Sequence, residues 1–149
     1  MKTIVTREDL EDRIDAVDGQ NTHAVVTLES GAFKKETEYS MCWVDLYAVD
    51  EETVELEAHI YAEGVDTPID QIIDFSAKNP VEGINNELDL YNDVLEAGSF
   101  RDKVETLGFD VDSLADFPMN IDVFALIMRN YLTDLKAVLE DTEIDMTDF

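Results

Sequence analysis

The first part of the chain carries an apolar pattern with helical spacing. Leu10, Ile14 and Val17 fall at i, i+4 and i+7, and the positions between them are mostly charged. Thr6 precedes this stripe and is followed three residues later by an acid, which is typical of a helix start. We therefore predict a helix over residues 7–17.

Three segments that follow have the composition and alternation of β-strands. Residues 22–30, 38–49 and 53–62 are rich in β-branched, aromatic and alternating apolar residues, and short polar links join them. We predict a three-stranded antiparallel meander with the middle segment in its centre, because that segment is apolar on both faces. One of those faces is expected to carry Tyr39, Met41, Trp43 and Tyr47.

The remainder of the chain has helical patterns. Proline at the first helical position after Thr67 and after Asn79 indicates two helix starts, and later apolar stripes indicate further helices that end near residue 139. Strands and helices are thus segregated, which favours an α+β fold. The predicted order is an N-terminal helix, a three-stranded antiparallel meander, and then four to five helices packed on the sheet, all in one domain over residues 1–149.

The predicted fold class is common, but the net charge of the chain is unusual. The chain has 36 Asp and Glu residues against 10 Lys and Arg residues, which gives a net charge of −26. From Glu36 to Ala77 there are twelve acidic residues and no Lys or Arg, and apolar residues are interleaved with them. Because the apolar content is too high for a disordered tail, we expect this charge to lie on folded elements. Such a surface repels nucleic acids and anionic membranes and attracts basic proteins.

The residues that could support catalysis are few. His23 and His59 fall on the first and third predicted strands, about 9.6 Å apart, which is too far to act as a pair. Cys42 lies in the apolar middle strand and is expected to be inert. Alternating acids at residues 110–112 and 141–145 lack the glycine and the terminal glutamate of an EF-hand. We therefore predict no enzyme activity, no cofactor and no metal site.

The ends of the chain and its cysteine content suggest a location. The first nine residues contain no apolar signal region and become acidic at once, and no segment reaches the roughly 18 apolar residues of a membrane span. The single cysteine cannot form an internal disulfide. We expect a cytoplasmic protein, in a bacterial host cell if the resemblance described next holds.

In size, charge and folded acidic run, the chain resembles the DNA-mimic proteins of phages and mobile elements, among them anti-restriction and anti-CRISPR proteins. The resemblance is compositional and covers roughly residues 36–100. It implies an inhibitor that occupies the nucleic-acid groove of a basic host protein, such as a nuclease, without binding nucleic acid itself. The residues expected to contact that partner are Glu51, Glu52, Glu55, Glu57, Glu63, Asp66, Asp89 and Asp93.

Two other interpretations remain open at this point. The aromatic sheet face around Trp43 would suit an adaptor that binds a partner, or a homodimer interface. Adaptation to high salt also gives acidic surfaces, although the six Lys against four Arg residues are mild evidence against it. A halophilic domain unfolds in low salt, a mimic competes with DNA, and an adaptor does neither.

Overall fold

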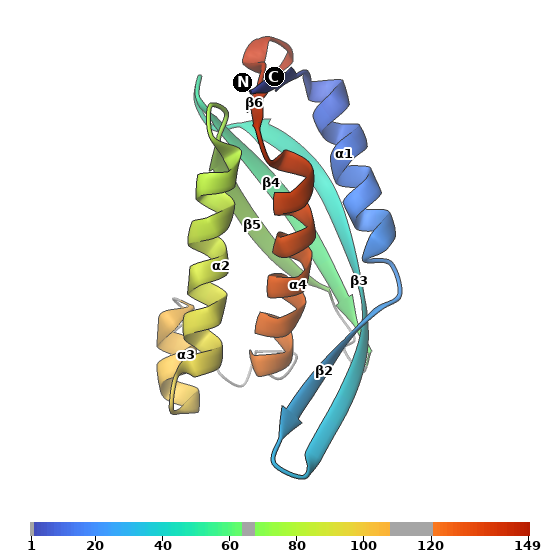
Figure 1. The fold of residues 1–149 in the computed structure, drawn as a ribbon, viewed down its shortest axis with the longest axis vertical. Coiled ribbons are helices and arrows are strands. Elements are labelled where there is room, and N and C mark those ends of the chain that lie inside the picture. The colour runs from blue at the N-terminus through green and yellow to red at the C-terminus, as the bar shows by residue number, and fades with distance from the viewer. Residues whose placement is uncertain (1, 64–67, 108–120) are drawn as a thin grey trace.

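A computed structural model describes residues 2–63, 68–107 and 121–149, and in it a four-stranded antiparallel sheet has helices packed against one face (Figure 1). The sheet order follows the chain, β2–β3–β4–β5. Its strands are β2 (Ala24–Ser30), β3 (Phe33–Ala48), β4 (Thr53–Ala62) and β5 (Ile69–Ser76). The described helices are α1 (Arg7–Gln20), α2 (Pro80–Glu96), α3 (Phe100–Thr106) and α4 (Ile121–Leu139).

The fold is α+β, but the predicted order and number of elements were wrong. Residues 69–76, expected to be a helix, form the fourth strand of the meander, and the described residues contain four α-helices. Ile73, Phe75 and Ala77 are buried at alternate positions, which is the period of a strand. Pro68 is equally compatible with the residue before a strand, so the local helix-start signal was overridden by pairing with β4.

A second, two-stranded sheet was not predicted. Strand β1 (Thr3–Val5) pairs in parallel with β6 (Thr142–Ile144), near the two ends of the chain. The Thr3 amide donates to the Asp141 carbonyl at 2.7 Å, and the Ile144 amide donates to the Ala77 carbonyl at 2.7 Å. The second bond ties this small sheet to the end of β5. A short 3-10 helix, η2 (Met146–Asp148), follows β6.

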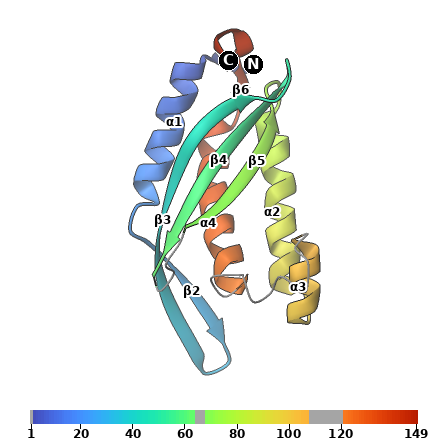
Figure 2. The same cartoon turned by 180° about the vertical axis from the view of Figure 1, so that it is seen from behind.

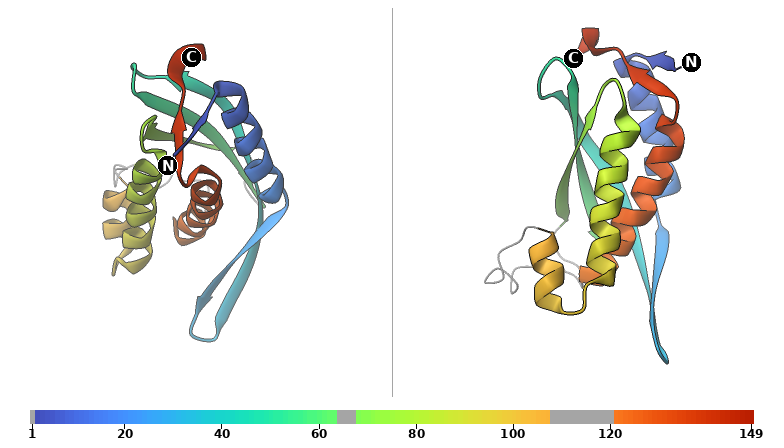
Figure 3. Two further views of the ribbon diagram at one scale, coloured as in Figure 1. Left: turned by 45° about the horizontal axis from the view of Figure 1, so that its top comes forward. Right: turned by 60° about the vertical axis from the view of Figure 1, so that its left-hand side comes forward.

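The core lies between the inner face of the large sheet and helices α2 and α4 (Figure 3). Tyr91 of α2 packs edge-on against Phe124 of α4, with ring centroids 5.8 Å apart, and both side chains are fully buried. These two helices bury apolar stripes at helical spacing, as the sequence predicted. In the part of the chain that the structure describes, no helix combines the length and apolar character needed to cross a membrane.

Helix α1 starts at Arg7 as predicted, where the Thr6 hydroxyl accepts a hydrogen bond from the Asp9 amide at 3.2 Å. It lies along the edge of β3 that β2 leaves free, because β2 pairs only with the first part of that long strand. The Met41 amide donates to the Asn21 carbonyl at 3.1 Å, and the Trp43 amide donates to the Asp18 carboxylate at 3.1 Å. The helix thus satisfies strand groups that would otherwise lack partners.

Among the described residues, no helix packs on the other face of the large sheet, as Figure 2 shows from behind. The described helices therefore cover one face of the middle strand β3, although its sequence is apolar on both faces. A β-bulge between Trp43 and Asp45 also shifts the alternation of β3. Tyr39 and Met41 are buried under the helices whereas Tyr47 is exposed, so the expected aromatic face does not exist. The four residues therefore do not form one exposed surface, because two of them lie in the core.

Candidate functional site

The uncovered outer surface of β3, β4 and β5 is the most unusual feature of the described chain, and we call it the open face. Where β3 pairs with β4 and β4 with β5, this face has five carboxylates, those of Asp45, Glu55, Glu57, Asp70 and Asp74, and the exposed apolar residues Val44, Tyr47, Tyr61 and Ile72. Tyr61 and Ile72 are each about half exposed, at 51% and 53%. The open face therefore combines negative charge with accessible apolar area.

Strand register places like charges directly against one another on this surface. Asp45 lies opposite Glu57, and Glu55 lies opposite Asp74. Directly opposed side chains on antiparallel strands have Cβ atoms about 4.5–5.5 Å apart, and like charges at that spacing are destabilising. Within the described residues, the only Lys or Arg within 4.0 Å of these five carboxylates is Arg7, whose Nη2 lies 3.7 Å from Asp45 Oδ1 at the edge of the sheet.

The Tyr47 phenol responds to this concentration of charge. The charge of Asp45 is the largest cause that raises the pKa of Tyr47, and desolvation, a hydrogen bond to Asp45 and the charges of Glu57 and Glu55 raise it further. A negatively charged phenolate is disfavoured beside three carboxylates. The raised pKa of Tyr47 is thus a consequence of the negative electrostatic potential from carboxylates on both β3 and β4.

The structure brings together part of the predicted contact set. Glu55 and Glu57 both project from β4 onto the open face. The expectation that they lie on an edge strand was wrong, because β5 pairs with β4 and makes it an interior strand. Glu51 and Glu52 are exposed in the link between β3 and β4, and Glu63 is exposed just after β4, so these three flank the open face at its two ends.

The remaining predicted residues lie elsewhere. Asp89 and Asp93 are exposed on α2, which covers the inner face of the sheet, so they are on the opposite side of the molecule from Glu55 and Glu57 (Figures 1 and 2). Asp66 lies outside the described residues. The eight predicted residues therefore do not form one surface.

Sequence reasoning missed three of the five carboxylates on the open face. Asp70 and Asp74 fall in the segment predicted to be a helix, and Asp45 falls in the apolar middle strand but is not in the predicted contact set. The alternation of apolar residues at 73, 75 and 77 was a usable signal for Asp74, because it places the even-numbered residues on the outer face. The bulge that exposes Asp45 leaves no comparable signal in the sequence.

A partly buried polar cluster between α1, β3 and α4 has a structural role. The Asp18 carboxylate accepts hydrogen bonds from the Trp43 amide at 3.1 Å and from the Tyr131 hydroxyl at 2.9 Å. Burial raises the pKa of Asp18 to about 6; the two hydrogen bonds oppose this shift, and the charge of Asp15 adds to it. Both of these hydrogen bonds tie α1 to β3 or α4, so this carboxylate serves packing.

The acidic stretches weighed as calcium ligands offer no assembled site among the described residues. Asp145 accepts hydrogen bonds from the backbone and side chain of Thr147 and so caps η2. Residues 110–112 lie outside the described residues. His23 was predicted on the first strand but lies in the turn before β2 with a φ of 59°, and its Nδ1 is 2.8 Å from Glu38 Oε1.

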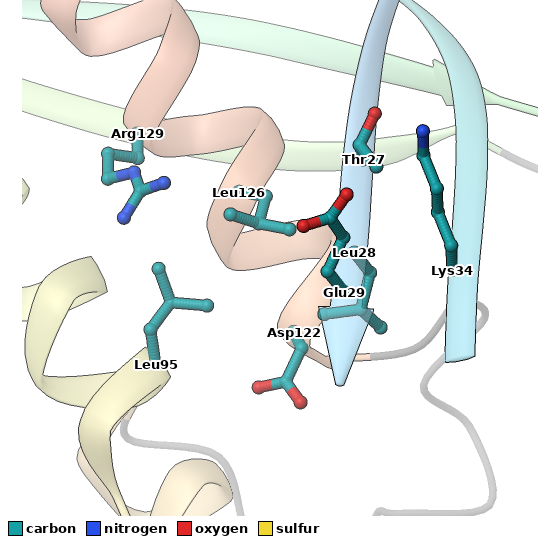
Figure 4. A pocket seen from close by; sticks show the side chains of 8 residues that line it. All are labelled: Thr27, Leu28, Glu29, Lys34, Leu95, Asp122, Leu126 and Arg129. Carbon is teal, nitrogen blue, oxygen red and sulfur yellow. The ribbon is translucent and has the colours of Figure 1, made fainter. Parts of the chain in front are cut away.

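A cavity of about 690 Å³ lies between the β2–β3 hairpin and helices α2 and α4 (Figure 4). Its lining mixes three leucines with both signs of charge: Thr27, Leu28, Glu29, Lys34, Leu95, Asp122, Leu126 and Arg129. Figure 4 shows Arg129 on the α4 side and Lys34 on the hairpin side. Lys103 lies 2.9 Å from Asp122, which offsets one of the negative charges. The lining has no convergent set of groups that would select one ligand charge.

No protein-family model matches the chain, and neither a curated protein nor a solved structure matches it.

Proposed function

We propose that this protein binds a basic, nucleic-acid-binding protein through the open face and blocks the groove that its partner uses for nucleic acid. The observation that carries the proposal is two pairs of directly opposed like charges, Asp45 with Glu57 and Glu55 with Asp74, on a sheet face that no helix of the described residues covers. Facing like charges lower the stability of a sheet, so packing does not account for them.

The spacing of these carboxylates suits a basic groove. Neighbouring strands are about 4.8 Å apart and alternate residues of one strand are about 6.6 Å apart, so the acids form short rows in two directions. A duplex presents one negative charge for about every 1.7 Å of its axis, which is denser than this face. The exposed apolar residues can compensate for this lower charge density. Tyr47, Tyr61 and Ile72 can bury apolar area against the same partner and so add to the binding free energy.

The proposal is tested with two triple variants that remove equal charge from opposite sides of the molecule. The first is Glu55→Gln, Glu57→Gln and Asp74→Asn on the open face. The matched control changes three acids of α2, by Asp89→Asn, Asp93→Asn and Glu96→Gln. Each protein is immobilised and exposed to a nuclease-treated bacterial lysate, and the retained proteins are identified by mass spectrometry and then challenged with duplex DNA.

We expect the wild-type protein and the α2 control to retain DNA-binding proteins that added duplex DNA elutes. The open-face variant should lose them, because the charge that attracts them is gone. Retention should also weaken as salt rises, since exposed charges are screened. Equal retention by both triple variants, or a partner that duplex DNA does not displace at any salt concentration, would overturn the proposal. Unfolding of the wild-type protein in low salt would instead assign its acidity to adaptation to high salt.

A further inference from the structure

Three side chains with metal-ligating atoms converge on the open face. They belong to Glu57, His59 and Asp70, and the ligand atoms that they offer all lie within 4.8 Å of one another. Within the described residues, no other group of three His, Cys, Asp or Glu side chains comes together in this way. We propose that these three residues, here named the triad, bind one divalent transition-metal ion of the Zn²⁺ type.

The backbone positions of the triad are fixed by the sheet. Glu57 and His59 are two residues apart on β4, so both side chains point to the outer face. Asp70 is the direct register partner of His59 on β5. Tetrahedral ligands with metal bonds of about 2.1 Å lie about 3.4 Å from one another, so small rotations of the side chains would bring the three donors into position around one ion. Ligands held on paired strands are positioned more accurately than ligands on a loop.

The local environment leaves an ion room to enter. His59 Nδ1 already contacts Asp70 Oδ1 directly, and a metal ion would take the place of the proton between them. The Asp70 side chain is 55% exposed and free to move outward, whereas that of His59 is only 21% exposed. The Tyr61 ring lies beside the imidazole with centroids 6.5 Å apart, which limits rotation of the histidine. His59 is thus the ligand whose position is more fixed, and Asp70 is the ligand that can adjust its position.

The donor set selects a class of ion. Imidazole favours Zn²⁺ and its transition-metal neighbours, whereas Mg²⁺ and Ca²⁺ prefer oxygen ligands alone. Two carboxylates balance the charge of a dication, and the other acids of the open face attract it. Cys42 lies opposite His59 on β3, but its thiol is directed to the Trp43 carbonyl at 3.3 Å. The site therefore has three protein ligands and an open position for water. The metal site does not depend on the proposed binding of a basic partner protein.

The test uses the fact that the chain contains only two histidines. Purified protein is titrated with Co²⁺ in the presence of excess Mg²⁺, and the imidazole protons are followed by NMR while Zn²⁺ affinity is measured by calorimetry. The matched control is His23, which lies beside a single carboxylate, that of Glu38. The variants are His59→Ala, His23→Ala, Asp70→Asn and Cys42→Ser, and thermal unfolding of each checks that the fold is intact.

We expect one equivalent of Co²⁺ to shift the His59 resonances and leave those of His23 in place. The His59→Ala and Asp70→Asn variants should weaken Zn²⁺ binding by about tenfold to a hundredfold. The His23→Ala and Cys42→Ser variants should bind Zn²⁺ with the affinity of the wild type. Equal paramagnetic effects on both histidines, displacement by Mg²⁺, or unchanged Zn²⁺ affinity in folded His59→Ala protein would each overturn the proposal. Those outcomes would leave His59 as an ordinary ion-pair partner of Asp70.

Discussion

At Gly83, helix α2 approaches strand β5 closely. A Cβ atom at this position would lie 2.8 Å from the Asp74 carbonyl oxygen, 2.9 Å from Phe75 Cβ and 3.0 Å from Phe75 Cα. Ordinary contacts of such an atom are 3.4–4 Å, and two of these three neighbours are backbone atoms that cannot rotate away. We therefore predict that Gly83→Ala destabilises the protein, because α2 or β5 must move to admit one methyl group.

The size of the effect follows from two opposing contributions. Replacing a helical glycine by alanine stabilises the helix by about 1 kcal/mol. Overpacking a tight contact costs about 1–3 kcal/mol. Gly19, in helix α1, has nothing within 4 Å of the point that an added methyl group would occupy, so Gly19→Ala gains the first contribution without the second. The difference in unfolding free energy between the two variants then isolates the steric cost, about 1–3 kcal/mol.

The assay is urea unfolding and thermal unfolding of the wild type and both variants under the same conditions. For a chain of 149 residues, a difference of 1 kcal/mol corresponds to about 2–4 °C in Tm. We expect Gly19→Ala to unfold at or above the wild-type temperature, and Gly83→Ala to unfold about 2–12 °C below Gly19→Ala. If Gly83→Ala were as stable as Gly19→Ala, helix α2 would not lie this close to β5 and the close contact between the two layers would be wrong.

Three further predictions concern polar groups. Because the pKa of Asp18 is raised from 3.8 to about 6 in the folded protein, its contribution to the free energy of unfolding is fully present below pH 3.8 and is lost as pH rises through about 6. In urea unfolding, the stability of Asp18→Asn relative to wild type should therefore increase between pH 4 and pH 7.5. The exposed control Asp12→Asn should show no such increase. Asn21 is fully buried, and its side chain accepts from the Tyr39 hydroxyl at 2.8 Å and donates to the Val17 carbonyl at 2.9 Å. Asn21→Ala should cost about 2–3 kcal/mol, and a loss below 0.5 kcal/mol would contradict its role as the centre of that network. Glu55→Gln should raise stability by about 0.2–1 kcal/mol in low salt by removing the repulsion from Asp74, and the gain should vanish near 1 M NaCl; a loss in low salt would contradict the charge arrangement of the open face.

Local patterns in the sequence were sufficient to locate most elements but not their partners. The stripe of Leu10, Ile14 and Val17 predicted α1, and all three residues are buried as that pattern requires. Residues 69–76 were misassigned because a proline signals a helix start in isolation, whereas the pairing with β4 that decides the matter is a tertiary contact. Pairing of β1 with β6 left no signal, because each strand has only three residues.

The candidate site was predicted in its chemistry more than in its geometry. The absence of Lys and Arg between Glu36 and Ala77 identified the charged segment, and Glu55 and Glu57 were placed on an exposed face. Which acids stand next to them depends on strand register, and the sequence alone does not specify register. Nearness along the chain was also misleading. Asp89 and Asp93 were grouped with Glu55 and Glu57 because they follow the same acidic run, but they lie on the opposite side of the molecule.

The pairing of β1 with β6 has a consequence for the order of folding. Thr3 and Thr142 are register partners near opposite ends of the chain, so their contact closes a loop that spans nearly the whole sequence. Such long-range contacts carry the largest loop-closure entropy and form late. During synthesis β1 has no partner until residues 142–144 leave the ribosome, while the meander, whose strands follow one another along the chain, can pair much earlier. We therefore expect the small sheet to form last, and the amide of Ile144, bound to the carbonyl of Ala77, to join it to the strands of the meander.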